Sequence, residues 1–467
     1  MKLLDQLDQN FENHLTLLKE FVSIPSVSTD PQFKPDITTA SQWVKARCEE
    51  AGLVTEIRET AGHPAVVAHN GFREGLPHIL IYGHYDVQPA QKSDGWSHEP
   101  FQPTVTDGYL YGRGASDNKG QILAHLCALK ALSQTQEGIP VNVTVLVEGE
   151  EEIGSPNLSS ILETLATERP AMDLAIVSDT STAVKGRPMI QYSLRGIVIA
   201  EVFLTTARRE IHSGIFGGTT ENAIRALTRL LSKLYDEKNL VTIEGWYDQV
   251  ADPQDWEMRE LEKLPFEEAP YLEWIGATAP IGEGGFTTNQ RRWFRPTLEF
   301  NGIKGGYLGE GSKTIVPHKA SVKLSARLVP DQDPAHIQDM LEQWFHDNCP
   351  PGASLEYVRG QAGPPYIMGQ TDRERELLST AKEVLREAFE AEPLLSRHGG
   401  AIPIVTPFET ILGVKTLLMG MGFPDDGVHS YYERFRLEQF RKGSWMSRLA
   451  LHQFSRRSSA EAWGFSA

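Results

Sequence analysis

The sequence predicts an α/β protein in which a doubly wound, mostly parallel sheet carries an inserted α+β domain. Apolar β-type runs alternate with helical stretches at both ends of the chain, whereas the middle of the chain has a different pattern of strands and helices. The 467 residues exceed the usual size of one hydrophobic core, so two domains are expected. Several β-type runs lead directly to a histidine or an acidic residue, and a doubly wound sheet gathers such residues in one crevice at the carboxyl ends of its strands.

Residues 1–194 are expected to form the first part of the sheet domain. Leu4 to Val22 carries apolar residues at helical spacing, and Ser41 to Gly52 is typical of a helix that a glycine ends. Short apolar runs predict the strands, and a helix is expected directly after Asp117. The predicted strands are 65–68, 78–82, 141–147 and 171–177, and the helix is 119–133.

Residues 195–392 are expected to form the inserted domain, because the pattern changes after about Arg195. Strands are predicted at 197–205 and 320–329, helices at 221–234 and 334–348, with a polar, tryptophan-rich stretch between them. The chain then returns to the first domain over residues 393–467, where a strand at 416–421 leads toward His429. We expect the insertion to form a lid over the site.

The composition favours a soluble globular protein that acts on small molecules or binds a second copy of itself. Hydrophobic residues make up 40% and charged residues 23% of the chain, which suits a sizeable core. The 45 basic and 62 acidic side chains give a net charge of −17, which argues against a nucleic-acid partner, since phosphate binding needs a basic face. Neither a signal peptide nor a membrane span is expected. Three widely spaced cysteines cannot form a disulfide framework, so the cytoplasm is the expected location.

His84 and Asp86 stand just after the apolar run 78–82. In a metal site, the imidazole of His84 would be the ligand, and Asp86 would orient the ring and fix its tautomer. The alternative is a polar turn after a buried strand. Asp117 also has two interpretations: its divergent oxygens can bridge two metal ions, or its carboxylate can cap the following helix.

An acidic cluster follows the predicted strand 141–147 and contains Glu148, Glu150, Glu151 and Glu152. A run of acids is usually a solvated loop. Repulsion at the end of a buried strand is costly unless cations neutralise it, and adjacent glutamates can divide the roles of metal ligand and proton carrier, so we favour a functional cluster. Asp179 and His429 also follow predicted strands; taken alone, they would be a turn-forming acid and a surface histidine.

Together these residues resemble the co-catalytic dizinc metallopeptidases, a family that includes carnosinase-type dipeptidases, aminoacylase, glutamate carboxypeptidase and succinyl-diaminopimelate desuccinylase. The resemblance covers nearly the whole chain and rests on ordered motifs. These are Gly83-His84-Tyr85-Asp86-Val87-Gln88-Pro89, Gly112-Arg113-Gly114-Ala115-Ser116-Asp117, Glu151-Glu152-Ile153-Gly154-Ser155, His212-Ser213-Gly214 and Gly427-Val428-His429-Ser430.

The resemblance implies two divalent metal ions and a role for each residue around them. Asp117 would bridge the ions, His84 and Asp179 would complete the shell of one, and Glu152 and His429 would complete the shell of the other. Glu151 would be the general base that takes a proton from the attacking water and passes it to the leaving amine, with Asp86 orienting His84. The fold implied is a zinc-peptidase catalytic domain with an inserted lid and dimerisation domain.

Within the insertion, the resemblance implies that His212 crosses a dimer interface and stabilises the oxyanion of the partner subunit's substrate. The alternative for His212 is a capped turn. The runs around Thr314 and Arg327 look like the carnosinase and cysteinylglycine dipeptidase branch, in which a Thr and an Arg hold the terminal carboxylate of the substrate. The alternative for Arg327 is a surface ion pair.

The loop 397–403 departs from that branch, which commonly has Glu and Ser where this chain has His398 and Ala401. Loss of the serine hydroxyl removes a possible contact with the substrate carboxylate. Gly399 and Gly400 are still expected to offer backbone donors to the substrate.

The sequence therefore predicts a dimeric, cytoplasmic metallohydrolase that cleaves dipeptides or similarly small peptides with a free C-terminus. Its two metal ions are expected to be zinc, with manganese or cobalt as alternatives. The alternative activity is removal of an N-acyl group from an amino acid by the same chemistry. A metal-binding regulatory protein without catalysis is disfavoured, because neither Glu151 nor any ligand is missing.

Overall fold

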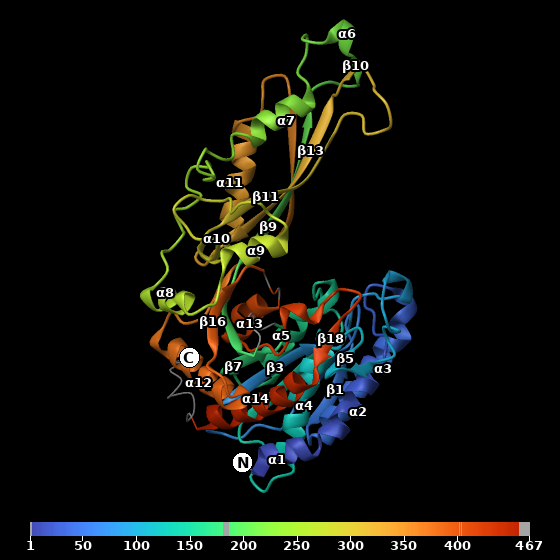
Figure 1. The fold of residues 1–467 in the computed structure, drawn as a ribbon, viewed down its shortest axis with the longest axis vertical. Coiled ribbons are helices and arrows are strands. Elements are labelled where there is room, and N and C mark those ends of the chain that lie inside the picture. The colour runs from blue at the N-terminus through green and yellow to red at the C-terminus, as the bar shows by residue number, and fades with distance from the viewer. Residues whose placement is uncertain (1, 181–185, 401, 403, 457–467) are drawn as a thin grey trace. The chain divides into compact units, whose positions relative to one another are not determined.

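The computed structural model describes residues 2–180, 186–400, 402 and 404–456, which fold into two compact units (Figure 1). The first unit comprises residues 1–192, 368–396 and 403–467, and the second comprises 193–367 and 397–402. The second unit is therefore an insertion in the chain of the first.

The sheet of the first unit has the strand order β1-β2-β6-β3-β7-β17-β8. Neighbours among β6, β3, β7 and β17 are parallel, whereas β2 pairs antiparallel with β1 and β6, and β8 pairs antiparallel with β17. This mostly parallel sheet confirms the predicted fold class. The strands are β1 (Val54–Arg58), β2 (Ala65–His69), β3 (His78–His84), β6 (Asn142–Glu148), β7 (Leu174–Val177), β8 (Met189–Leu194) and β17 (Thr416–Leu418), with β15 (Tyr366–Ile367) and β16 (Leu394–His398) pairing with β8.

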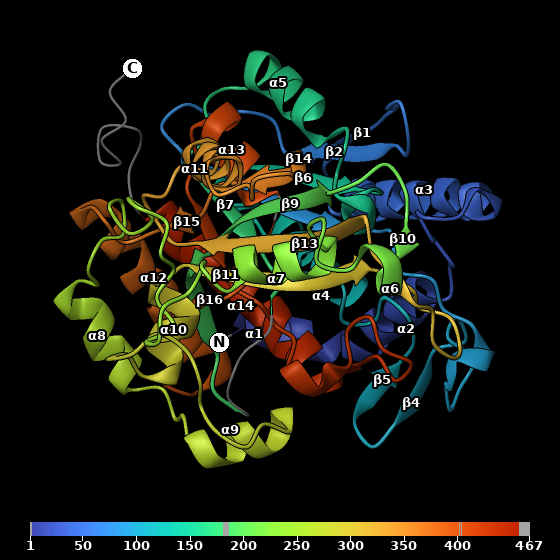
Figure 2. The same cartoon turned by 90° about the horizontal axis from the view of Figure 1, so that it is seen from above.

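Helices cover both faces of this sheet. α4 packs against α14, with α12, α1 and α2 around them, and α5 packs against α13 on the opposite face (Figure 2). Every residue of β3 and β6 is buried, as expected for strands covered on both sides. The helices are α1 (Lys2–Gln9), α2 (Phe11–Val22), α3 (Lys34–Glu50), α4 (Lys119–Ser133), α5 (Leu158–Glu168), α12 (Asp372–Phe389), α13 (Val405–Leu412) and α14 (Leu437–Ser455); β4 (Thr104–Thr106), β5 (Tyr109–Tyr111) and β18 (Arg434–Arg436) form a small separate sheet.

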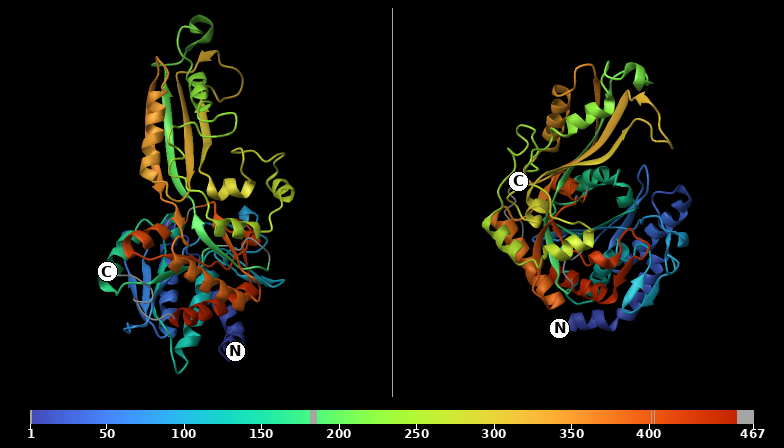
Figure 3. Two further views of the ribbon diagram at one scale, coloured as in Figure 1. Left: turned by 90° about the vertical axis from the view of Figure 1, so that its left-hand side faces the viewer. Right: turned by 45° about the horizontal axis from the view of Figure 1, so that its top comes forward.

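The second unit is built on a four-stranded antiparallel sheet of order β11-β13-β9-β14. Burial alternates along β9 because one face carries the core, which includes Val202, Leu227, Val322 and Phe345. α7 and α11 supply the other side of this core and can be followed with the sheet in Figure 3. The elements are β9 (Gly196–Thr205), β10 (Ile211–His212), β11 (Thr297–Gly305), β12 (Ile315–Val316), β13 (Lys319–Leu328), β14 (Ser354–Gly363), α6 (Ser213–Phe216), α7 (Ala223–Leu231), α8 (Asp255–Glu262), α9 (Glu268–Ile275), α10 (Thr288–Phe294) and α11 (Pro334–Asp347).

The end of the insertion differs from the sequence-based boundary at residue 392. Residues 368–396 belong to the first unit, because α12 buries Leu377, Leu378, Ala381 and Leu385 and packs against α14. A second difference is α3, which begins at Lys34 rather than Ser41, with a proline in its first turn. Within the part of the chain that the structure describes, no helix has both the length and the apolar character needed to cross a membrane.

The buried His125 lies where three elements of the first unit meet. It predicts how the unfolding free energy of the protein changes at low pH. Its ring nitrogens lie 2.8 Å from the Ser447 and Ser178 hydroxyls, and burial lowers the pKa of His125 to about 4. Because the unfolded histidine binds its proton more tightly, this stabilisation is complete above about pH 6.5 and is lost as the pH falls toward 4. In urea unfolding, His125→Gln should reduce the pH dependence of the unfolding free energy by up to about 1.4 kcal/mol per pH unit in that window. An unchanged slope would contradict a neutral, buried His125.

Candidate metal centre

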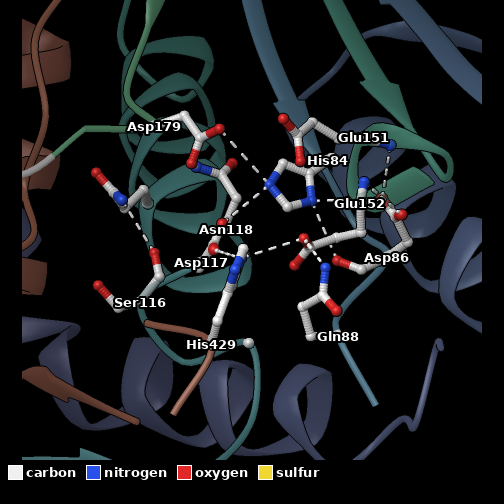
Figure 4. A network of polar contacts seen from close by, with 12 residues as sticks. His84, Asp86, Gln88, Ser116, Asp117, Asn118, Glu151, Glu152, Asp179 and His429 are labelled. Atoms are coloured by element: carbon white, nitrogen blue, oxygen red, sulfur yellow. Dashed lines mark hydrogen bonds and ion pairs between the residues drawn. The ribbon is translucent and has the colours of Figure 1, made fainter. Parts of the chain in front are cut away.

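All the residues expected to bind or serve a metal pair converge in the first unit (Figure 4). They come from the carboxyl ends of neighbouring parallel strands and from two loops. His84 ends β3, the Glu151-Glu152 pair follows β6, Asp179 follows β7, Asp117 precedes α4, and His429 lies after β17. The crevice expected at the ends of the parallel strands is therefore the one that these side chains occupy.

Asp117 stands between the two histidines. Its Oδ1 lies 3.1 Å from Nε2 of His84, and its Oδ2 lies 3.0 Å from Nε2 of His429. His84 Nε2 is also 3.7 Å from Asp179 Oδ2, and His429 Nε2 is 3.2 Å from Glu152 Oε2. Each histidine thus shares Asp117 and has one carboxylate of its own, which is the arrangement of two adjacent ion sites.

Glu151 and Asp86 also belong to the centre, but neither of them stands between the two histidines as Asp117 does. A Glu151 carboxylate oxygen lies within 4.8 Å of ligand atoms of His84 and Asp179. Among the described residues, no donor bonds to the Glu151 carboxylate, so it is available to other groups. Asp86 is fully buried and accepts the backbone N–H groups of Glu151 at 3.2 Å and Glu152 at 3.1 Å. Its Oδ1 also lies 3.3 Å from Nδ1 of His84, so one carboxylate positions both the ring and the acidic turn.

The electrostatics of the centre fit divalent cations. Burial lowers the pKa of His84, but hydrogen bonds to Asp117, Asp179 and Asp86 outweigh burial and raise that pKa well above its usual value. Burial raises the pKa of Glu151 far above its ordinary value; His84 opposes this rise, and repulsion from Asp179 adds to it. Five carboxylates and two imidazoles therefore hold excess negative charge in a largely buried place. Oxygen and nitrogen donors with this charge suit zinc, manganese or cobalt.

Glu433 positions the Asp117 loop. This role was not predicted from the sequence. Its buried carboxylate accepts the Arg113 guanidinium at 2.6 Å and the backbone N–H groups of Gly114, Ser116 and Asp117 at 3.0 to 3.1 Å. These contacts fix the backbone from which the Asp117 side chain projects. This role has little signature in the sequence, because the partners are mainly backbone groups far away in the chain.

Glu433→Gln should weaken metal binding without removing a ligand. The amide loses one acceptor and leaves the buried Arg113 without its counter-charge. We expect the zinc dissociation constant to rise about 10- to 100-fold and the unfolding free energy to fall by about 3 kcal/mol. Zinc titration and urea unfolding measure the two effects. The control is Glu438→Gln, which changes an exposed ion pair with Lys442 on α14; equal effects in both variants would contradict the positioning role.

Two further polar neighbours were also not predicted. Gln88 donates from Nε2 to Glu152 Oε2 at 2.8 Å, and Asn118 donates from Nδ2 to Asp179 Oδ1 at 3.1 Å. Each hydrogen bond holds a carboxylate that faces a histidine. Gln88 and Asn118 lie in or beside the motifs that identify the site, so their closeness to Asp86 and Asp117 was the available signal.

The remaining predicted residues lie in the second unit. His212 pairs with Ile315 across β10 and β12, and Ser213 donates its N–H to the Thr314 carbonyl at 3.0 Å, so His212 and Thr314 are close neighbours. Both side chains are exposed. Nδ1 of His212 accepts the Gly214 N–H at 3.0 Å, which leaves Nε2 of the neutral ring as the N–H donor.

Arg327, Gly399 and Gly400 also lie in the second unit, with Arg327 on β13 opposite Thr297 of β11. Arg195 donates its Nε to the Gly399 carbonyl at 2.9 Å and its backbone N–H to the Gly400 carbonyl at 3.2 Å. The Gly400 N–H donates to His398 Nδ1 at 3.1 Å, and substrate binding by this N–H stays a prediction. Ala401 lies outside the described residues.

Comparisons with known proteins identify the family of this chain. The sequence pattern of peptidase family M20/M25/M40 matches residues 80–452. A Cys-Gly metallodipeptidase of Schizosaccharomyces pombe is 30% identical, with 95% of each chain covered. The human Beta-Ala-His dipeptidase is 28% identical over 95% of this chain and 90% of its own length.

Solved structures are also similar to this chain over nearly its whole length. A metallo-carboxypeptidase of the M20 family from Sulfolobus solfataricus has a TM-score of 0.81 and 28% identity, covering 95% of this chain and 99% of its own. The human carnosine dipeptidase 1 has a TM-score of 0.77 and 27% identity, covering 97% and 98%. The resemblance inferred from the motifs is confirmed, and the chain belongs to peptidase family M20/M25/M40.

Proposed function

We propose that this metallopeptidase hydrolyses the peptide bond of dipeptides or similarly small peptides that carry a free C-terminal carboxylate. The observation that carries the proposal is the convergence of two histidines and two further carboxylates around Asp117, with Glu151 beside them (Figure 4). The Cys-Gly and Beta-Ala-His dipeptidase activities of similar proteins support the substrate class.

Two zinc ions are the proposed cofactors. His84 and Asp179 would hold one ion, Glu152 and His429 would hold the other, and Asp117 would contact both. Bound dications supply Lewis-acid polarisation of the scissile carbonyl and lower the pKa of an attacking water. Asp86 and Gln88 keep His84 and Glu152 in place while these groups act.

Glu151 is the proposed proton carrier. Its carboxylate has no donor among the described residues, and burial raises its pKa, so the group binds a proton readily. Nearby cations would offset part of that rise and bring the pKa toward neutrality, where a carboxyl accepts and returns a proton most effectively. Glu151 would accept the proton of the attacking water and deliver it to the leaving amine.

The metal-restored dipeptidase assay tests this function. Protein stripped of metal should regain cleavage of Cys-Gly and β-Ala-His with zinc or manganese, as followed by release of free amino acids. C-terminal amidation of either dipeptide should slow cleavage about 10²-fold, because Arg327 would lose the carboxylate that it grips bidentately. Faster cleavage of N-acetyl or N-succinyl amino acids would establish a deacylase instead, and faster release of the C-terminal residue from longer peptides would establish a carboxypeptidase.

We also propose a homodimer in which His212 serves the partner subunit's site. The free Nε2–H of His212 can stabilise negative charge developing on the substrate carbonyl oxygen. If so, the Glu151→Gln and His212→Ala proteins should each be inactive. Refolding the two variants together should restore about a quarter of wild-type activity. Half of the randomly formed dimers would be mixed, and each mixed dimer would contain one complete site out of two. Mixtures that stay inactive, despite heterodimers seen by native mass spectrometry, would contradict a cross-subunit role.

The proposed location is the cytoplasm. Cys48, Cys127 and Cys349 are all free, and burial raises the pKa of the Cys48 and Cys127 thiols to about 12. Three unpaired thiols suit a reducing compartment.

A further inference from the structure

Three polar side chains lie along one side of α4, although this helix of the first unit is buried along most of its length. They are Asn118, Gln121 and His125, and spacings of three and four residues bring side chains to the same face of a helix. Their exposed fractions are 1%, 3% and 1%. Buried polar groups destabilise a fold unless hydrogen bonds satisfy them, so the partners of these side chains indicate what they do.

Gln121 joins the Asp117 loop to the segment that follows β17. Its Nε2 donates to the Ser116 carbonyl at 2.9 Å, and its Oε1 accepts the Met421 N–H at 2.8 Å. Ser116 directly precedes Asp117, and Met421 lies on the way from β17 to His429. One buried amide on α4 therefore holds the backbone beside a predicted metal ligand.

Asn118 and His125 both contact Ser178, the residue between β7 and Asp179. Asn118 Nδ2 donates to the Ser178 carbonyl at 2.8 Å and to Asp179 Oδ1 at 3.1 Å (Figure 4). His125 Nε2 lies 2.8 Å from Ser178 Oγ, which donates to the Met419 carbonyl at 2.8 Å. The main-chain oxygen and the side-chain oxygen of Ser178 are thus both held from α4, so Asp179 projects from a backbone that is fixed to this helix.

The hydrogen bonds around His125 have a defined direction. The Met419 carbonyl takes the hydroxyl proton of Ser178, so Ser178 Oγ accepts from the ring, and Nε2 of His125 must carry the ring proton. Nδ1 of the neutral ring then accepts from the Ser447 hydroxyl of α14 at 2.8 Å. Burial lowers the pKa of His125 to about 4, which keeps the ring neutral at neutral pH. We call these four residues the hydrogen-bond chain; it runs from α14 through α4 to the ends of β7 and β17.

We infer that His125 is a positioning residue of the metal centre, which acts on Asp179 through Ser178. The inference rests on the proposed function, in which Asp179 and His84 hold one zinc ion. Both ring nitrogens of His125 contact serine hydroxyls, so His125 is not itself a ligand. Residues that hold a metal ligand in place typically change the metal affinity 10- to 100-fold when they are replaced, by roughly the scale known for such supporting groups.

Two serine variants separate positioning from stability. Ser178→Ala and Ser447→Ala each remove one buried hydroxyl that contacts His125, so both should lower the midpoint of urea unfolding. Only Ser178→Ala should weaken the zinc ion held by Asp179, with a dissociation constant about tenfold or more above wild type, and the ion held by His429 should change less than about twofold. Calorimetric titration of the metal-free protein with zinc measures both constants. Equal weakening of both ions, or an equal effect of the two variants on zinc, would overturn the inference.

The ring proton of His125 gives a second test, which needs neither a variant nor turnover. Nitrogen NMR of the metal-free protein with labelled histidine should show His125 protonated on Nε2 alone at neutral pH, with a proton that exchanges slowly because the ring is buried. A proton on Nδ1 would overturn the inference, because Ser178 would then donate to the ring and lose its bond to the Met419 carbonyl.

Failure of the inference and failure of the proposed function give different results. Unchanged zinc constants in Ser178→Ala would overturn the positioning role of His125 and leave the dipeptidase function standing. A wild-type protein that bound two zinc ions and cleaved no dipeptide would overturn the proposed function. The zinc constants of Ser178→Ala would still decide the inference in that case, because they are measured without a substrate.

Discussion

Glu151→Gln should lower kcat on a dipeptide by about 10³-fold while both metal ions remain bound. The glutamine side chain has almost the same shape as glutamate but cannot accept a proton at neutral pH. Glu151 receives no hydrogen bond on its carboxylate from any described residue, so the substitution breaks no polar contact there. Steady-state kinetics and metal analysis of the same preparation measure both quantities.

The measured metal content distinguishes two roles for Glu151, a proton carrier and a metal ligand. The ligand role has to be tested because the Glu151 carboxylate lies within 4.8 Å of ligand atoms of His84 and Asp179. A proton carrier can be lost with both ions retained, whereas a ligand cannot. The control is Glu163→Gln, which changes an exposed glutamate on α5 and should leave kcat unchanged. Wild-type turnover in Glu151→Gln would refute the base, and loss of one ion would make Glu151 a ligand.

The sequence predicted that the candidate metal ligands lie together, because their positions follow from local patterns. A buried strand is recognisable as an apolar run, and the polar residues just after it must lie at the carboxyl edge of the sheet. His84, Asp179 and the Glu151-Glu152 pair were found in this way. In the structure, ligand atoms of His84, Glu151 and Asp179 lie within 4.8 Å of one another, and Glu152 Oε2 lies 3.2 Å from His429 Nε2.

Glu433 and α12 show what local patterns cannot supply. The role of Glu433 depends on backbone N–H groups of the loop 114–117, and every residue type except proline offers such a group. The helix α12 has an ordinary amphipathic pattern, and only its packing against α14 assigns it to the first unit. The Gly400 N–H likewise has no sequence signature for its acceptor, His398. Each of these depends on tertiary contacts between segments far apart in the chain or on the local path of a loop.

Asp117→Asn should remove metal and activity together. One Asp117 oxygen faces His84 and the other faces His429, so a single carboxylate serves both halves of the centre. An amide keeps one oxygen and presents an NH₂ group, which cannot ligate a cation, to the other half. We expect fewer than two ions per chain and a kcat/KM lower by about 10³-fold or more, as measured by metal analysis after dialysis and by dipeptide turnover.

The matched control is Asp107→Asn, in the exposed turn between β4 and β5, where the positive φ of 50° is one that asparagine also tolerates. This variant should keep both ions and full activity. Asp117→Asn with two ions and wild-type turnover would contradict the bridging position. Asp117→Asn and Glu151→Gln are the same chemical change at neighbouring carboxylates, so opposite effects on metal content would separate the group that holds the ions from the group that moves the proton.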